Sequence, residues 1–256
     1  MMKTVAFLKS GFDVERFRKK LLCKKKYKTL LETYFNDLPE IEDQNSPKFW
    51  DEKFATETES DLFPMSTDRN RIVGSLIQPN TKVLNIGAGM GYLEEVVFNT
   101  IGEHIDWTGT DITNQTLEKL KTNFPKYHFV KSKIEELPFE RDTFDIVCLL
   151  EVLEHISPRH TFGVLKKIHT VLKPGGTAII SVPVNEGLEM MPNNPNSHLR
   201  VYSKELLSFE ARISGFKIKR IIALTAFPNW YFVKKIINSI FNLRKPNNYI
   251  FILEKK

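Results

Sequence analysis

The segment Val83–Glu95 reads VLNIGAGMGYLEE and is the most informative part of this chain for its fold. A short apolar run meets Gly87, Gly89 and Gly91, and a helical pattern follows them. Glycine permits positive φ and close approach of the backbone, and the first turn of a helix has N–H groups without partners inside the helix. Such a turn at the carboxyl edge of a parallel sheet predicts a nucleotide-like ligand. A tight strand-to-helix turn without a ligand is the alternative, because a lone glycine pattern is weakly specific.

Apolar strand-like runs and helical patterns alternate around this stretch. Strands are expected at 81–86, 104–110, 127–132, 144–150 and 176–182, and helices at 92–100, 114–124 and 160–172. The alternation predicts a parallel sheet with helices on both faces, and Pro174-Gly175-Gly176 is expected to end the last of these helices. After residue 184 we expect a polar loop, a helix at 203–213, a strand at 216–224, a helix within 227–241 and a strand at 248–255.

Charge and cysteine content limit the class of protein. The chain has 256 residues and a net charge of +6, and its only cysteines are Cys23 and Cys148. Without a CxxC pair or an apolar run of the ~20 residues of a membrane span, we expect a cytoplasmic protein without a disulfide framework. Residues 1–30 carry ten basic side chains against two acidic ones, and residues 217–256 carry nine against one. These basic ends suit either solvated helix faces or a phosphate-bearing partner.

Further motifs follow the glycine turn along the chain. Asp111 follows Gly91 by twenty residues and ends the second expected strand, where a carboxylate can accept both hydroxyls of a ribose. The segments IEELPFERDTFDIV (134–147), LLEVLEHI (149–156) and VLKPGGTAIISVP (171–183) come next. In order and spacing, roughly residues 65–185 resemble the class I S-adenosylmethionine (SAM)-dependent methyltransferases, the broad family that includes the ubiquinone- and menaquinone-pathway methyltransferases. The spacing G-x-G-x-G is similar to motif I of that family, whereas a dinucleotide fingerprint would need a small residue at Tyr92.

The resemblance implies a Rossmann-like, seven-stranded, mostly parallel sheet with helices on both faces, and SAM as cofactor. It implies a domain over 63–256, a helical N-terminal extension over 1–62, and a helical insertion at about 226–247 that acts as an acceptor-side lid. Gly87, Ala88 and Gly89 would line the methionine portion of SAM, and Asp111 would hold its ribose. The other positions implied at the cofactor site are Ile112 and Ile134 on the two adenine faces, Leu150 near the sulfonium, and Asn85, Gly91 and Lys133.

Two of these positions depart from the family pattern. Asn85 stands where motif I usually has an acid that anchors the ammonium group of SAM. Its amide oxygen can accept a hydrogen bond, but without the strength of a charged acceptor. Lys133 stands where many relatives have an acid for the adenine amino group. A cation cannot accept that bond, so adenine recognition would fall to backbone groups.

The sequence Glu151-Val-Leu-Glu154-His155 carries the candidate chemistry. A helical turn beginning at Glu151 would put residues 151, 154 and 155 on one face. They either cap and pack the turn, or supply a base (His155 or Glu151), or bind a divalent ion such as Mg²⁺ or Mn²⁺ through Glu151, Glu154 and His155. The last pattern resembles ubiquinone-pathway O-methyltransferases and small-RNA 2′-O-methyltransferases. His198 is expected close to the same edge of the sheet. There it is a metal ligand, a base, a substrate contact or a loop histidine that bonds to backbone.

The expected function is methyl transfer from SAM to a small-molecule or a lipid- or sugar-linked acceptor, with oxygen favoured over carbon or nitrogen. The alternatives are a metal-assisted RNA 2′-O-methyltransferase and a SAM-binding relative without turnover. Aromatic side chains around Phe227–Phe241 are interleaved with Lys234 and Lys235, which suits either an active-site cover or peripheral membrane contact. Nucleic acid is a less favoured partner, and the oligomeric state is open. Trp50 is expected to close the cofactor pocket or to anchor the amino-terminal helix.

Overall fold

The structure is a computed structural model that describes residues 44–56, 64–158, 160–186, 196–227 and 229–256. Residues 1–43 and 57–62 of the expected N-terminal extension, Cys23 among them, lie outside the described residues. Within that extension the structure describes helix α4, Pro47–Thr56. Its first turn is capped by Ser46, whose Oγ accepts a hydrogen bond from the Phe49 N–H at 3.1 Å.

Seven strands form one sheet in the order β3-β2-β1-β4-β5-β7-β6. The strands are β1 Lys82–Ile86, β2 Asp106–Asp111, β3 His128–Lys131, β4 Phe144–Leu150, β5 Leu172–Pro183, β6 Phe216–Leu224 and β7 Asn248–Lys255. Strands β1 to β5 pair in parallel, and β7 lies antiparallel between β5 and β6. The predicted seven-stranded, mostly parallel sheet is confirmed. The order reverses at β1, so the carboxyl ends of β1 and β4 form the crevice where such sheets bind ligands.

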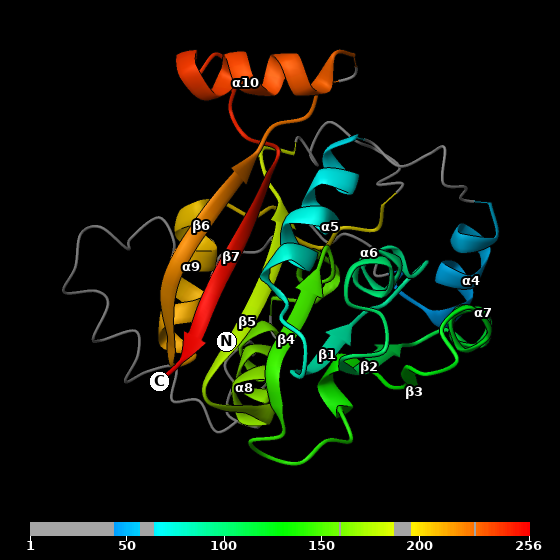
Figure 1. Cartoon of the computed structure of the whole chain (residues 1–256). Coiled ribbons are helices and arrows are strands. Elements are labelled where there is room, and N and C mark those ends of the chain that lie inside the picture. Colours follow the sequence, from blue (N-terminus) through cyan, green and yellow to red (C-terminus); the bar gives the residue numbers. More distant parts are fainter. Residues whose placement is uncertain (1–43, 57–63, 159, 187–195, 228) are drawn as a thin grey trace.

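Helices cover both faces of the sheet (Figure 1). Helices α5 Pro64–Leu76, α6 Tyr92–Ile101 and α7 Asn114–Asn123 pack on one face, and α8 Thr161–Val171 and α9 Lys204–Ile213 pack on the other. The central strand β4 shows why both faces are covered. Its Ile146 and Cys148 lie in the core with α5 to α7, while Val147 and Leu149 lie in the core with α8 and α9. Each such aliphatic side chain contributes about 1.5–3 kcal/mol on burial.

One predicted boundary is wrong. Helix α8 ends at Val171, and β5 begins at Leu172. The residues Pro174-Gly175-Gly176 therefore lie inside the strand and do not end the helix. The pairing with β4 passes from Phe144–Leu172 to Ile146–Thr177, so the extra residues form a bulge, in which Gly175 adopts φ +74°.

The predicted insertion before the last strand is the helix α10, Tyr231–Phe241. It stands beyond the end of β6 and the start of β7, at the same edge as the carboxyl ends of the parallel strands (Figure 1). None of the helices in the described ranges is long and apolar enough to cross a membrane.

Candidate functional site

A cavity of about 650 Å³ opens at the carboxyl edge of the sheet. Its volume lies within the range of small-molecule sites. It is lined by the β1–α6 turn, by the segment after β4, by α4 and α5, and by the loops that follow β5 and that flank α10. Of the residues predicted from the sequence, those that line it are Asn85, Gly87, Ala88, Gly89, Leu150, Glu151, Glu154, His155, His198 and Trp50.

The glycine turn forms as the sequence predicts, and its glycines have different tasks. Gly87 has φ +72°, and a Cβ there would lie 2.5 Å from the Cγ2 of Val152. Gly91 has φ +83°, and a Cβ there would lie 2.4 Å from Leu120 of α7. Gly91 therefore lets α6 pack closely on α7, and it is not among the residues that line the cavity. The cavity meets the turn at Gly87, Ala88 and Gly89.

Behind this turn, Asn85 is paired with a buried acid that the sequence analysis missed. The Asn85 Nδ2 donates to Glu94 Oε1 at 2.8 Å, and the Trp107 Nε1 donates to the same oxygen at 3.2 Å. Burial raises the pKa of Glu94 to about 7, although these two hydrogen bonds oppose the shift. Because Asn85 uses its amino group here, its oxygen is the side-chain atom left to accept a bond from a ligand. Glu94 shares the buried side of α6 with Leu93 and Val97, which is the sequence signal for its burial.

Asp111 ends β2 and holds the glycine turn. Its Oδ2 accepts the Gly89 N–H at 2.9 Å, and its Oδ1 accepts the Thr113 N–H at 3.0 Å and the Thr113 hydroxyl at 2.9 Å. The β2 end is thereby tied to the β1–α6 turn, as the motif spacing requires. Of the neighbouring adenine-side positions, Ile134 is buried in the short helix η3, Ile134–Glu136, Ile112 is half-buried, and Lys133 is exposed. Asp111, Ile112, Lys133 and Ile134 do not line the cavity, so their contacts with SAM stay predictions.

Glu151 lies outside the helical turn that the sequence suggested. It has φ +55°, and the short 3₁₀ helix η4 spans Leu153–His155, so Glu151 precedes the helix. Its carboxylate accepts hydrogen bonds from Asn248 Nδ2 at 2.8 Å and from Ser181 Oγ at 2.7 Å, and it pairs with Arg69 of α5 at 3.2 Å. These partners join β4, β5, β7 and α5 at the cavity. No sequence pattern indicates Arg69 or Asn248, which come from elements far apart in the chain.

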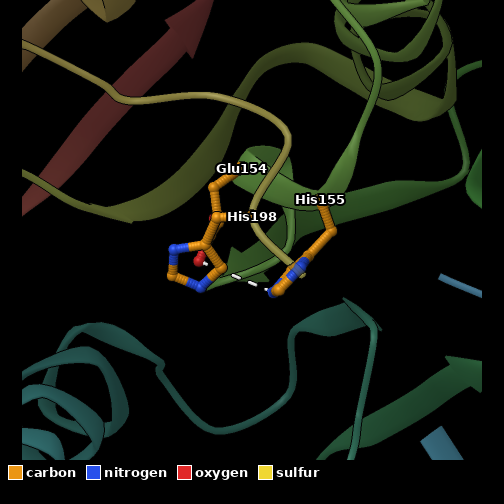
Figure 2. A group of neighbouring side chains, drawn as sticks. All are labelled: Glu154, His155 and His198. Atoms are coloured by element: carbon orange, nitrogen blue, oxygen red, sulfur yellow. Dashed lines mark ion pairs between the residues drawn. The ribbon is translucent and has the colours of Figure 1, made fainter. Parts of the chain in front are cut away.

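The side chains of Glu154, His155 and His198 converge instead (Figure 2). One ligand atom from each of the three lies within 4.8 Å of the other two, and the two imidazole centroids are 4.8 Å apart. Glu154 is almost fully buried, and neither of its carboxylate oxygens has a hydrogen-bond partner among the described residues. The structure therefore brings His198, rather than Glu151, into the group that the sequence analysis proposed as metal ligands.

Burial shifts the pKa values of His155 and Glu154 in the direction that favours their neutral forms. Burial, with His198 and Lys53 nearby, lowers the pKa of His155 to about 3. Burial, with Glu151 nearby, raises the pKa of Glu154 well above its ordinary value. The Ser197 carbonyl lies 3.2 Å from His155 Nδ1, and a carbonyl only accepts, so the neutral ring carries its proton on Nδ1 and leaves Nε2 basic. His198 Nδ1 contacts the Glu186 carboxylate at 2.8 Å.

Helix α4 forms the outer wall of the cavity. Trp50 packs edge-on against the His155 ring, with centroids 4.8 Å apart. Phe54 faces the glycine turn, since a Cβ at Gly89 would lie 3.6 Å from the Phe54 Cζ. None of the residues of α4 is fully buried, so Trp50 serves here as a cavity wall and not as a core anchor.

Comparison with known proteins identifies the class of the domain. Residues 83–176 match the family described as "Methyltransferase domain". The chain is 29% identical over 143 residues to the ubiquinone/menaquinone biosynthesis C-methyltransferase of Vibrio parahaemolyticus. This match covers 52% of this chain and 54% of that relative. It is 32% identical over 100 residues to an uncharacterized methyltransferase of Synechocystis, covering 39% and 46% of the two chains. The chain thus spans about half the length of the relatives that it matches.

Solved structures show the same fold. A SAM-dependent methyltransferase from Archaeoglobus fulgidus superposes with a TM-score of 0.59 at 22% identity, over 81% of this chain and 99% of that one. A SAM-dependent methyltransferase from Aquifex aeolicus gives a TM-score of 0.58 at 16% identity, over 82% and 99%. At these identities the likeness establishes the fold and no more.

Proposed function

Because this chain belongs to the class I SAM-dependent methyltransferases, we propose that it transfers the methyl group of SAM to an oxygen atom of a small-molecule or a lipid- or sugar-linked acceptor. The observation that carries the proposal is one cavity lined both by the glycine turn at Gly87–Gly89 and by the cluster of Glu154, His155 and His198. The first element suits the methyl donor, and the second suits a hydroxyl acceptor.

The glycine turn and its neighbours offer chemical groups that suit the parts of SAM. Family membership implies SAM as the methyl donor, whose sulfonium makes the methyl group transferable. The backbone at Gly87–Gly89 and the oxygen of Asn85 would hold its methionine end, while Asp111 would hold its ribose. The protein contributes mainly by aligning donor and acceptor in the cavity, and alignment of this kind supplies much of the acceleration in such displacements.

The Glu154, His155 and His198 cluster would hold a divalent cation, Mg²⁺ or Mn²⁺. The fit rests on a buried carboxylate whose two oxygens have no hydrogen-bond partner among the described residues, next to two imidazoles. A bound cation would act as a Lewis acid that lowers the pKa of an acceptor hydroxyl. Glu186, whose carboxylate contacts His198 Nδ1, has the place of the outer carboxylate that commonly orients a ligating imidazole. His155 is a weak base at a pKa of about 3, so it suits a ligand better than a general base.

Carbon methylation is the second candidate, because the relative from Vibrio parahaemolyticus is named as a C-methyltransferase. The two candidates differ in the bond that is formed. Incubation with SAM labelled with ¹³C in the methyl group, and NMR of the product, separates a methyl ether from a methyl on carbon.

The first experiment measures SAM binding and methyl acceptors together. We expect calorimetric titration of SAM to give a saturable signal, and label from SAM to enter a lipid or small-molecule fraction of host extract. Label in RNA, with affinity that falls steeply with salt, would support an RNA 2′-O-methyltransferase instead. SAM binding without label in any fraction would support a relative without turnover, and no SAM binding at all would refute the proposal.

The second experiment tests the cation. Chelation is expected to lower activity, and Mg²⁺ or Mn²⁺ to restore it. Manganese binding followed by electron paramagnetic resonance should be lost in His155→Ala and His198→Ala. It should be retained in His104→Ala, because His104 is exposed in the loop before β2. Full activity after exhaustive chelation, with equal manganese binding in all variants, would remove the cation from the mechanism.

A further inference from the structure

Helix α10 turns its polar side to the protein and its apolar side to solvent. The inward side chains are Tyr231, Lys235 and Asn238, which follow the i, i+4, i+7 spacing of one helix face. The Tyr231 hydroxyl donates to Asp68 Oδ2 at 2.9 Å, and Lys235 pairs with the same oxygen at 2.5 Å. Asn238 Nδ2 donates to Thr225 Oγ1 at 3.3 Å. The helix is thus attached to the body of the protein by polar contacts.

The opposite side of α10 is a continuous exposed apolar surface. Phe232, Ile236 and Ile240 follow one another at four-residue spacing, with Val233 and Ile237 beside them. Trp230 before the helix is 77% exposed, and Ile240 is 68% exposed. The whole apolar surface of α10 consists of Trp230, Phe232, Val233, Ile236, Ile237, Ile240, Phe241 and Leu243. Soluble surfaces carry scattered apolar side chains, whereas a contiguous patch marks an interaction site.

The segment of sequence that carries this surface has charges of one sign only. Residues 211–253 contain eight basic side chains and no Asp or Glu. Lys234 flanks the apolar surface on the helix itself, and Arg244 and Lys245 follow its end; all three are exposed. An apolar stripe bordered by cations is the pattern of helices that lie in the interface of an anionic bilayer.

We propose that α10 docks on the surface of an anionic lipid bilayer, with its apolar surface among the acyl chains and its flanking cations at the head groups. The helix has 11 residues, or about 16 Å at 1.5 Å per residue, so it lies along the membrane plane and does not span it. A second copy of the chain fits less well. A two-fold contact through α10 would bring the Lys234, Arg244 and Lys245 of one copy near those of the other, and residues 211–253 supply no acid to offset them.

The position of α10 connects docking to the cavity. Ala226 and Asn247, which flank the helix on either side, both line the cavity. The helix stands over the edge of the sheet at which the cavity opens (Figure 1). Docking would therefore place the cavity at the bilayer surface, where a lipid-linked acceptor is presented. This last step rests on the proposed function, whereas docking itself does not.

The test is co-sedimentation of the full chain with vesicles, without SAM or acceptor. We compare pure phosphatidylcholine with a mixture of phosphatidylcholine and phosphatidylglycerol. We expect binding to the anionic vesicles, with an increase and blue shift of Trp fluorescence that is lost in Trp230→Phe. The double variant Ile236→Asn/Ile240→Asn should bind on the order of tenfold more weakly or worse, because two apolar side chains no longer enter the acyl region.

Matched variants separate docking by α10 from general basicity of the chain. Ile236→Leu/Ile240→Leu keeps the apolar surface and should bind like the native chain. Lys234→Glu should weaken binding about fivefold or more, since each cation near an anionic surface contributes about that factor. The same charge reversal at an exposed position of α8, Lys166→Glu, should have little effect on vesicle binding. Circular dichroism and the melting temperature of each variant show that the fold is retained.

Two outcomes would overturn the proposal. Equal vesicle binding by the native chain and by Ile236→Asn/Ile240→Asn would assign any membrane affinity to another segment, such as the basic residues 1–30. No vesicle binding, together with dimerisation that the same double variant abolishes, would assign the apolar surface to a second copy. Because SAM binding is measured separately, neither result is confused with failure of the proposed function.

Discussion

Helices α9 and α10 are both short amphipathic helices from the last third of the chain, and they use their apolar sides in opposite ways. Helix α9 buries Leu206, Leu207, Phe209 and Ala211 and is capped by Ser203, which accepts the Leu206 N–H. Helix α10 buries Tyr231 alone. The first is held by the hydrophobic core between α8 and β6, and the second by polar contacts to Asp68 and Thr225.

The contrast shows what amphipathic spacing does and does not determine. The spacing of apolar residues predicts that a helix has an apolar side, but not that this side faces the protein. Burial of each large aliphatic residue stabilises α9 by about 1.5–3 kcal/mol, whereas polar contacts such as those of α10 contribute about 0.5–1.5 kcal/mol each. Helix α9 is therefore part of the cooperative fold, and α10 is an appendage that another surface can engage.

The largest expected effect on stability comes from the buried ion pair between Arg200 and Glu210 of α9. Arg200 Nη1 lies 2.6 Å from Glu210 Oε1, and both side chains are fully buried. Glu210→Ala should lower the free energy of unfolding by about 3–5 kcal/mol, because it removes the acid that pairs with the buried Arg200. Urea unfolding measures the loss. The double change Arg200→Met/Glu210→Leu should recover much of it, and a double variant as unstable as the single one would contradict this account.

A core truncation in α9 comes next in size. Leu207 is fully buried between α9 and the sheet. Leu207→Ala should lower the free energy of unfolding by about 2–5 kcal/mol through lost burial and the remaining cavity. Thermal unfolding followed by circular dichroism measures this change. A loss as small as that of a surface substitution would mean that α9 is not part of the core.

A smaller effect is expected where α10 is attached. Asp68→Ala removes the partner shared by Tyr231 and Lys235. Hydrogen exchange of the α10 amides should become faster by an amount equal to about 1–2 kcal/mol of local opening, with little change in the global melting temperature. Asp106→Ala is the matched control, because its ion pair with Lys82 is exposed. Unchanged exchange in α10 would show that these polar contacts do not hold it.

The smallest effect on stability is expected on the outer side of α10. Ile240→Ala should change the free energy of unfolding by no more than about 0.5 kcal/mol, because the native side chain is already exposed to water. Chemical unfolding of the two proteins side by side makes the comparison. A loss comparable to that of Leu207→Ala would show that the apolar surface of α10 is covered within the protein, and would remove the contrast between the two helices.

Most of the fold could be predicted from the sequence because its signals are local. Alternating strand and helix periods, and glycines at 87, 89 and 91, depend on neighbouring residues only. Asn85 and Leu150 were expected at the site from the family resemblance, and His155 from the sequence Glu151–His155; all three line the cavity. The β5 bulge at Gly175 was not predicted, since a breaker after a helix and a bulge in a strand use the same residues.

The features of the site that were not predicted depend on contacts between elements far apart in the chain. Glu151 has φ +55°, and its carboxylate is held by Arg69, Ser181 and Asn248, a set of partners that no local pattern encodes. The burial of Glu94 and Glu210 had a readable signal, since each lies on the buried side of its helix. Acidic side chains are seldom fully buried. The spacing of Glu94 and Glu210 therefore does not by itself outweigh the expectation that an acid on a helix faces solvent.

The ends of the α10 insertion meet on paired strands. Leu224 and Asn248 are partners in the β6–β7 ladder, and the Asn247 N–H donates to the Leu224 carbonyl at 2.8 Å. The sheet thus closes its hairpin before the insertion begins, and residues between 226 and 246 add no strand pairing to it. Exchange, lengthening or deletion of this segment would therefore leave the strand pairing of the sheet intact.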